Sequence, residues 1–149
     1  MRGLDLAACL HTEFVAPLLS REFPRLAHAA ALIGDGSEVL GYDDAISADH
    51  DFGPRLQIFL EDADFLAAAS PIVQRLRDVL PETIHGHPVA FADRDRPIGL
   101  DAAGFCGSPH HGVEVSTVRA WFRRSLCVAD SACPETLSPP SAVSTAGRT

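Results

Sequence analysis

The chain of 149 residues contains no lysine, so all 12 of its basic residues are arginines. Together with 20 acidic residues this gives a formal net charge of −8 at pH 7. Proteins that bind nucleic acid regardless of its sequence need a basic surface, so the charge argues against that class. Any side-chain cation that contacts a phosphate must be an arginine, which can bind two phosphate oxygens at once.

Cysteine is scarce, and long apolar runs are missing. The cysteines are Cys9, Cys106, Cys127 and Cys133, which form no CxxC pair and match no common zinc-binding spacing. We interpret them as free thiols in a reducing cytoplasm. No stretch is long enough for a membrane span, and the first residues lack the apolar run of a signal peptide. We therefore predict a cytoplasmic protein without a membrane segment.

The composition is that of a folded protein of one domain. Hydrophobic residues make up 46% of the chain and charged residues 21%, which is ordinary for a globular domain. We predict that this domain spans residues 4–128. Residues 129–149 are rich in Ser, Pro, Ala and Thr and have no periodicity. Such a segment buries too little apolar surface to offset its ordering entropy, so we predict a disordered tail.

Hydrophobic periodicity predicts the main elements. Apolar residues recur at helical spacing over 4–19 and 64–80, and Pro17 is expected to kink or end the first helix. Residues 55–61 alternate as in a strand. Further elements are predicted as strands at 27–34, 87–93 and 112–118, a helical turn at 37–40 and a short helix at 119–126. This order indicates an α/β or α+β fold, with one small mixed sheet and flanking helices.

Asp49 and Asp51 are the strongest candidates for metal ligands. The triplet Asp49-His50-Asp51 is expected to open the strongest predicted strand, where residues two apart point to the same face. Two carboxylates so close would repel each other and raise one pKa. A divalent cation removes this conflict, and Mg²⁺ prefers oxygen ligands. Two similar triplets have simpler interpretations: Asp62 or Asp64 caps a helix, and 93–95 lies in a solvated loop.

Other residues complete a possible phosphate site. Gly36-Ser37 is a turn whose backbone N–H groups suit a phosphate. Arg55, close after Asp51, is a candidate contact for a triphosphate. Glu114, between two valines of a predicted strand, is the first candidate for a third acid, and Asp93 is the second. Such an arrangement suits nucleotidyl transfer assisted by two metal ions.

At these residues the sequence resembles the polymerase-beta-like nucleotidyltransferase superfamily. The residues that follow its pattern in order are Gly36, Ser37, Gly41, Ser47, Asp49, Asp51 and Glu114. More closely, 36–55 and 110–126 resemble an uncharacterised bacterial family within that superfamily. The resemblance extends from Thr12 to Val128. It implies a nucleotidyltransferase-like core that binds two Mg²⁺ ions and a nucleoside triphosphate through these residues.

The resemblance also implies an activity, and three departures from the pattern bear on it. The implied reaction transfers a nucleoside monophosphate to a small-molecule acceptor with a hydroxyl or amine. Asp35 and His50 stand where apolar residues are usual, and the tail does not resemble the expected helical C-terminal region. We therefore expect weak nucleotide binding and poor transfer, as in a truncated copy. The alternative is a catalytically silent nucleotide-binding module, or a regulatory, antitoxin-type one with a partner protein.

Several residues have competing interpretations. His50, His85-Gly86-His87 and His110-His111 suggest a zinc or iron site, although their spacing fits no compact pattern. For His110 and His111 we favour a place in the lining of a pocket. Glu114 has an alternative as an exposed partner of Arg119. Trp121 and Phe122 are expected in the core, where aromatic residues of short helices usually pack.

Overall fold

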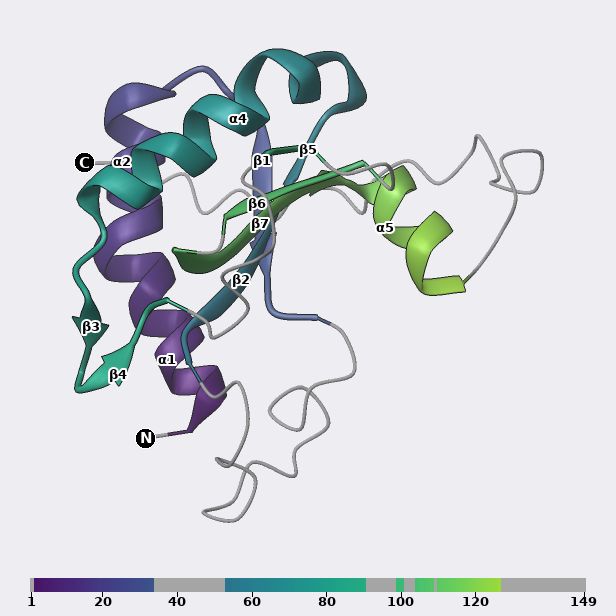
Figure 1. Ribbon diagram of the computed structural model, residues 1–149. Coiled ribbons are helices and arrows are strands. Elements are labelled where there is room, and N and C mark those ends of the chain that lie inside the picture. Colours follow the sequence, from purple (N-terminus) through teal and green to yellow (C-terminus); the bar gives the residue numbers. More distant parts are fainter. Residues whose placement is uncertain (1, 34–52, 91–98, 101–103, 109, 127–149) are drawn as a thin grey trace.

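The computed structural model describes residues 2–33, 53–90, 99–100, 104–108 and 110–126 (Figure 1). These residues form a five-stranded sheet in the order β1-β2-β7-β6-β5 and a separate two-stranded hairpin. The sheet strands are β1 His28–Ala31, β2 Arg55–Leu60, β5 Gly99–Leu100, β6 Phe105–Ser108 and β7 His111–Thr117. β2 and β7 run parallel, whereas the other neighbours are antiparallel. The predicted α/β class with a small mixed sheet is confirmed.

The two faces of the sheet differ in chemistry. In β2, the alternating residues Leu56, Ile58 and Leu60 are almost fully buried. They pack with Val113 and Val115 of β7 against the helices, and this helix-covered face forms the main core. The intervening residues point the other way. We call this opposite side the second face; it carries Arg55, Gln57 and Phe59 from β2 and Gly112, Glu114 and Ser116 from β7.

The N-terminal helix is continuous but changes its winding in the middle. It comprises α1 Gly3–Leu10, a π-helical turn η1 His11–Val15 and α2 Ala16–Glu22. The N–H of Ala16 bonds to the carbonyl of His11, five residues back. Pro17 follows at once, and the wider turn accommodates a residue whose ring clashes with the preceding turn of a regular helix. Pro17 therefore does not end the helix, which continues to Glu22.

Helix α4, Asp62–Val79, covers the face of the sheet that carries Leu56, Ile58 and Leu60 (Figure 1). Its buried residues recur three or four positions apart: Phe65, Ala69, Ile72, Val73 and Leu76. The predicted capping by Asp62 or Asp64 is wrong. The residue before the helix is Glu61, whose carbonyl accepts from the N–H groups of Asp64 and Phe65, and no side chain caps the helix. Pro71 lies inside the helix with an exposed side chain.

The predicted strand at 87–93 is mostly wrong. Only β4 His87–Pro88 forms, paired with β3 Thr83–Ile84, and Val89 and Ala90 lie beyond its end. Residues 91–93 are outside the described part of the chain. The hairpin turns at His85-Gly86, where both residues have positive φ, 49° and 81°. This turn fits the right-handed twist of a hairpin and is one that histidine adopts more readily than most residues do.

Helix α5, Val118–Leu126, follows β7 directly and lies apart from the other helices (Figure 1). The Thr117 hydroxyl accepts from the N–H of Ala120 at 3.1 Å and so caps its start. Trp121 and Phe122 touch edge to face, with ring centroids 5.3 Å apart, but both are only half-buried. The expectation that they belong to the core is therefore wrong.

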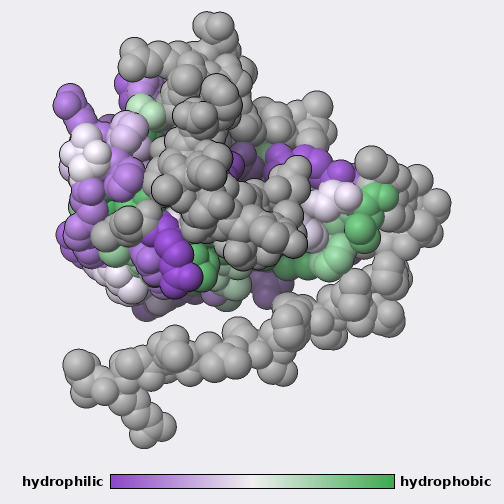
Figure 2. Space-filling view, turned by 90° about the horizontal axis from the view of Figure 1, so that it is seen from below, coloured by the Kyte–Doolittle hydropathy of each residue, from purple (hydrophilic) through white to green (hydrophobic). Residues whose placement is uncertain are grey.

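The surface is mixed in character. Seen from below, hydrophilic residues gather on the side of the N-terminal helix and the hairpin, and a hydrophobic area lies toward α5 (Figure 2). Leu126 at the end of α5 is 59% exposed. Within the described ranges, no helix combines the length and the apolar character that crossing a bilayer requires.

Candidate functional site

The predicted site residues divide into two groups. Gly36, Ser37, Asp49 and Asp51 lie outside the described residues, and so does Asp93, the alternative third acid. Arg55 and Glu114 are described. The predicted strand at 55–61 forms as β2 from Arg55, but Gly53 and Pro54 precede it outside the strand, so the triplet does not open the strand directly as expected.

Arg55 and Glu114 lie on the second face, on two paired strands. In the parallel pairing of β2 with β7, Arg55 is opposite Gly112 and Gln57 is opposite Glu114. Residues two apart in a strand share a face, so Arg55, Gln57 and Glu114 all project from the second face. The spacing between strands and the rise per residue put the Cα atoms of Arg55 and Glu114 about 8 Å apart. A cation and a carboxylate are therefore close neighbours on this face.

Arg124 of α5 reaches Glu114. Arg124 Nη2 lies 3.5 Å from Glu114 Oε2, and its guanidinium carbon lies 3.4 Å from the centroid of the Phe105 ring. Stacking on a buried aromatic ring holds the guanidinium beside the carboxylate. Arg119, the alternative partner of Glu114, instead pairs with Asp62 at 3.3 Å. The Glu114 side chain is 23% exposed, so its carboxylate is neither sealed in the core nor fully solvated.

Among the described residues, the histidines do not form the joint site that their sequence suggested as an alternative, and His50 lies outside these residues. His111 is 2% exposed; its Nε2 lies 3.0 Å from the carbonyl of Val73, and its Nδ1 accepts from the N–H of Val113. This ring connects β7 to α4 inside the core, so a place in the lining of a pocket is excluded for it. His110 is exposed, and His85 and His87 belong to the β3–β4 hairpin.

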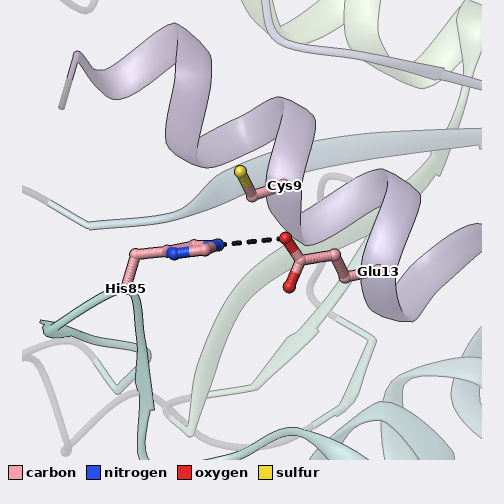
Figure 3. Close-up of side chains that lie close together, drawn as sticks. All are labelled: Cys9, Glu13 and His85. Atoms are coloured by element: carbon pink, nitrogen blue, oxygen red, sulfur yellow. Dashed lines mark hydrogen bonds and ion pairs between the residues drawn. The ribbon is translucent and has the colours of Figure 1, made fainter.

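One other cluster of potential ligands lies between the N-terminal helix and the hairpin (Figure 3). Single ligand atoms of Cys9, Glu13 and His85 all lie within 4.8 Å of one another. His85 Nε2 is 3.0 Å from Glu13 Oε1. Cys9 is half-buried, whereas the side chains of Glu13 and His85 are 46% and 43% exposed. This is the one group of three or more such residues within the described ranges.

The chemistry of Cys9 reflects this neighbourhood. Burial raises the pKa of its thiol above the ordinary value, and the Glu13 carboxylate raises it further by its charge and by a hydrogen bond. The thiol is therefore protonated at neutral pH in the metal-free protein. The sequence contained half of the signal, since Cys9 and Glu13 are four apart in a predicted helix and share its face. The sequence suggested His85 as a ligand in a site made of histidines, but nothing in it joined His85 to Cys9 and Glu13.

Comparison of the chain with protein-family models, with curated proteins and with solved structures returns no match.

Proposed function

We propose that the chain is a nucleotidyltransferase-like domain that binds a nucleoside triphosphate with Mg²⁺ on the second face of the sheet. Asp49, Asp51 and Glu114 are the proposed metal ligands in this hypothesis. Gly36, Ser37 and Arg55 are the proposed phosphate contacts. The reaction in this proposal transfers a nucleoside monophosphate to a hydroxyl or amine of a small acceptor.

The observation that carries the proposal is the shared face of Arg55 and Glu114. The two residues are far apart in the sequence, yet the parallel pairing of β2 and β7 brings them onto neighbouring strands. A transferase of this type needs carboxylates for the metal and cations for the phosphates in the same place. Arg55 follows Asp51 by four positions, which limits their Cα separation to about 14 Å. The Asp49-His50-Asp51 triplet is therefore tied to the start of the same strand.

The described residues fit an oxygen-ligated divalent ion in part. Glu114 supplies a half-buried carboxylate of the kind that Mg²⁺ prefers. Its ion pair with Arg124 is long, at 3.5 Å. When bound, Mg²⁺ neutralises phosphate charge and polarises the reacting phosphorus. The chain's own part is to position the triphosphate, with Arg55 and Arg124 as the described cations on this face.

Nucleotide binding tests the proposal directly. Isothermal titration with ATP, GTP, CTP and UTP, each with and without Mg²⁺, should reveal binding of at least one nucleotide that depends on the ion. Asp51→Asn and Glu114→Gln should each weaken this binding at least about tenfold, because each removes a charged metal ligand. The matched control is Glu82→Gln, an exposed glutamate of the segment before the hairpin, which should bind as the wild type does.

The outcomes separate the alternatives. Absence of Mg²⁺-dependent binding to all four nucleotides, or equal binding by Asp51→Asn, overturns the proposal. Loss in Asp51→Asn and Asp93→Asn but not in Glu114→Gln transfers the role of third acid to Asp93. Incubation of labelled nucleotide with a panel of hydroxyl and amine acceptors then distinguishes an enzyme from a silent binding module. Turnover that Asp51→Asn abolishes identifies the enzyme.

A cytoplasmic location is part of the same proposal. The described cysteines, Cys9 and Cys106, are free thiols, which agrees with a reducing compartment. Fractionation of cells that produce the tagged protein tests this, and recovery from an oxidising compartment would contradict it.

A further inference from the structure

The cluster of Cys9, Glu13 and His85 has the donor set of a zinc site. Zn²⁺ binds thiolate sulfur, imidazole nitrogen and carboxylate oxygen, often three protein ligands and one water. Tetrahedral zinc separates neighbouring ligand atoms by about 3.3–3.6 Å. Here the nitrogen and the carboxylate oxygen are 3.0 Å apart, and all three ligand atoms lie within 4.8 Å of one another. Side-chain adjustments of about 1 Å are enough to reach bonding geometry.

Two of the donors are placed by the N-terminal helix. Cys9 belongs to α1 and Glu13 to the π-helical turn, and their side chains extend from the same side of the helix toward the hairpin (Figure 3). A π-helical turn inserts one residue into a helix and often accompanies a functional site. The burial pattern shows the insertion, because the buried residues Leu10 and Val15 are five positions apart. Downstream residues still face the core, while Glu13 faces Cys9 and the hairpin.

The third donor sits at the tip of a hairpin that is anchored in the core. Ile84 and Val89 flank the tip and are 3% and 2% exposed. The N–H of Val89 donates to the carbonyl of Glu82 at 3.0 Å and closes the base of the hairpin. His85 itself has φ 49°, a conformation that is unfavourable for most residues. The buried residues beside the tip therefore hold His85 in an unfavourable backbone conformation, close to Cys9 and Glu13.

We propose that Cys9 Sγ, Glu13 and His85 Nε2 bind one Zn²⁺ ion, with a water molecule as the fourth ligand. On binding, the Cys9 thiol loses its proton to the buffer and the ion replaces the hydrogen bond between Glu13 and His85. Because Glu13 and His85 are both partly exposed, solvent reaches the fourth position. The ion joins the N-terminal helix to the hairpin and stabilises the folded chain, since the unfolded chain does not hold these residues together.

Cobalt tests the site, because Co²⁺ replaces Zn²⁺ in tetrahedral sites and its bond to a thiolate gives a charge-transfer band. Titration of the purified full chain with Co²⁺ should produce this band and strong visible absorption at one ion per chain, and Zn²⁺ should then remove both. Cys9→Ser should abolish the charge-transfer band. Loss of a partner that only orients a ligand costs 10–100-fold in affinity, so loss of a ligand should weaken Zn²⁺ binding by more than about 100-fold.

Two more variants keep the proposal testable if Cys9→Ser fails to fold. Glu13→Gln changes an exposed residue, and His85→Asn keeps a residue type that tolerates positive φ. Both should weaken Zn²⁺ binding, and both should lose the rise in melting temperature that Zn²⁺ gives the wild type. The controls are Cys133→Ser and His110→Asn, which should retain the band and the affinity. Wild-type affinity in Cys9→Ser, or a cobalt spectrum without a thiolate band, overturns the proposal.

The ion pair between His85 and Glu13 is the competing explanation of the cluster. If Glu13 and His85 serve only to form this ion pair, Zn²⁺ should leave the melting temperature of the wild type unchanged, and the proposal fails. A failure here leaves the nucleotide-binding proposal intact, because the two sites share no residue and their tests use different ions.

Discussion

The His111 imidazole makes two hydrogen bonds although it is almost fully buried. Nε2 lies 3.0 Å from the carbonyl of Val73, and Nδ1 accepts from the N–H of Val113. The first bond needs a proton on Nε2 and the second needs a lone pair on Nδ1, so this arrangement requires the neutral ring. Burial lowers the pKa of His111 below its ordinary value near 6.5, and the neighbouring His110 lowers it further. A second proton would therefore break the arrangement.

The first prediction concerns acid stability. The unfolded chain takes up a proton on His111 near pH 6.5, whereas the folded chain takes it up only at lower pH. The contribution of His111 to stability is thus complete above pH 6.5 and decreases as the pH falls below it. Urea denaturation of the wild type should show a lower free energy of unfolding at pH 5.5 than at pH 7.5.

Substitution of His111 makes this prediction specific. His111→Gln should cost about 1–3 kcal/mol at pH 7.5, because buried hydrogen bonds are lost. It should also reduce the difference in stability between pH 7.5 and pH 5.5. His110→Gln, at the exposed neighbour, serves as the control. An equal pH dependence in His111→Gln and in the wild type would show that other groups cause it.

At the scale of single elements, the N-terminal helix depends on a match between Pro17 and the π-helical turn. In a regular α-helix the ring of Pro17 would clash with the carbonyl of Glu13, at a cost of about 3 kcal/mol or more. Because the turn at His11–Val15 is wider, the helix continues through the proline. The extra residue and the proline thus compensate each other.

Deletion of Thr12 tests this compensation. The deletion returns the turn to α-helical winding and leaves Leu10 and Val15 four positions apart, still suited to the core. It should destabilise the chain by about 3 kcal/mol or more, because Pro17 then lies inside a regular helix. Adding Pro17→Ala to the deletion should recover most of this loss in chemical denaturation. If both deletion variants are equally stable, the π-helical turn does not serve the proline.

A second helix contact, between Glu22 and Arg75, joins the end of α2 to α4. The guanidinium meets the carboxylate in a two-pronged arrangement, with Nε–Oε2 at 2.7 Å and Nη2–Oε1 at 2.8 Å. Hydrogen bonds from Arg75 lower the pKa of Glu22 from 4.5 to about 2. The pair therefore stabilises the fold above about pH 4.5, and this contribution is lost as the pH falls toward 2.

Arg75→Lys should show how much the two parallel hydrogen bonds contribute to stability. Lysine keeps the charge but cannot form the two parallel bonds, so the urea midpoint at pH 7 should fall. At pH 2, near the pKa of Glu22, about half of the carboxylate is protonated and most of the stabilisation is lost, so the variant and the wild type should differ much less. Arg77→Lys, at an exposed position of the same helix, should leave the midpoint unchanged at both pH values. A pH-independent loss in Arg75→Lys would assign the effect to packing.

The elements that sequence alone could predict are those with a strong period. Helix α4 and strands β2 and β7 carry apolar residues at regular spacing, and all three form close to where we predicted them. Strand β6 was missed because Phe105–Ser108 is short and contains a glycine, so it has little alternation. The hairpin was missed because His85-Gly86 replaces the usual Asn-Gly signal and Pro88 stands in a strand.

The candidate sites also differ in how far local sequence spacing could predict them. Glu114 was recognisable because it stands alone among apolar residues of a strand, and the structure gives it Arg124 as a partner. Cys9 and Glu13 share a helical face that a sequence can reveal. Their meeting with His85 depends on how the hairpin packs against the helix, a tertiary contact that no local spacing encodes.

On the scale of the whole molecule, one layer of helices covers one face of the sheet, so the core is concentrated between them. Ile58 lies at its centre, with no exposed surface, on the strand between β1 and β7. Leu66 of α4, by contrast, is 82% exposed. Stability should therefore depend on the side of an element that a residue occupies rather than on its hydrophobicity.

Two truncations to alanine test this distribution. Ile58→Ala should lower the free energy of unfolding by about 2–5 kcal/mol, because it leaves a cavity in the packed layer. Leu66→Ala should change it by no more than about 0.5 kcal/mol. Both values can be read from urea denaturation at pH 7. Similar losses in the two variants would contradict the assignment of the core.

The parallel pairing of β2 with β7 also has a consequence for synthesis of the chain. The ribosome completes β2 well before β7, and α4, the hairpin and β6 are made between them. Until β7 emerges, the nascent chain presents an unpaired edge of β2 with Leu56, Ile58 and Leu60. Such an edge is open to wrong pairing, so a nascent chain that stalls before β7 should be a substrate for chaperones.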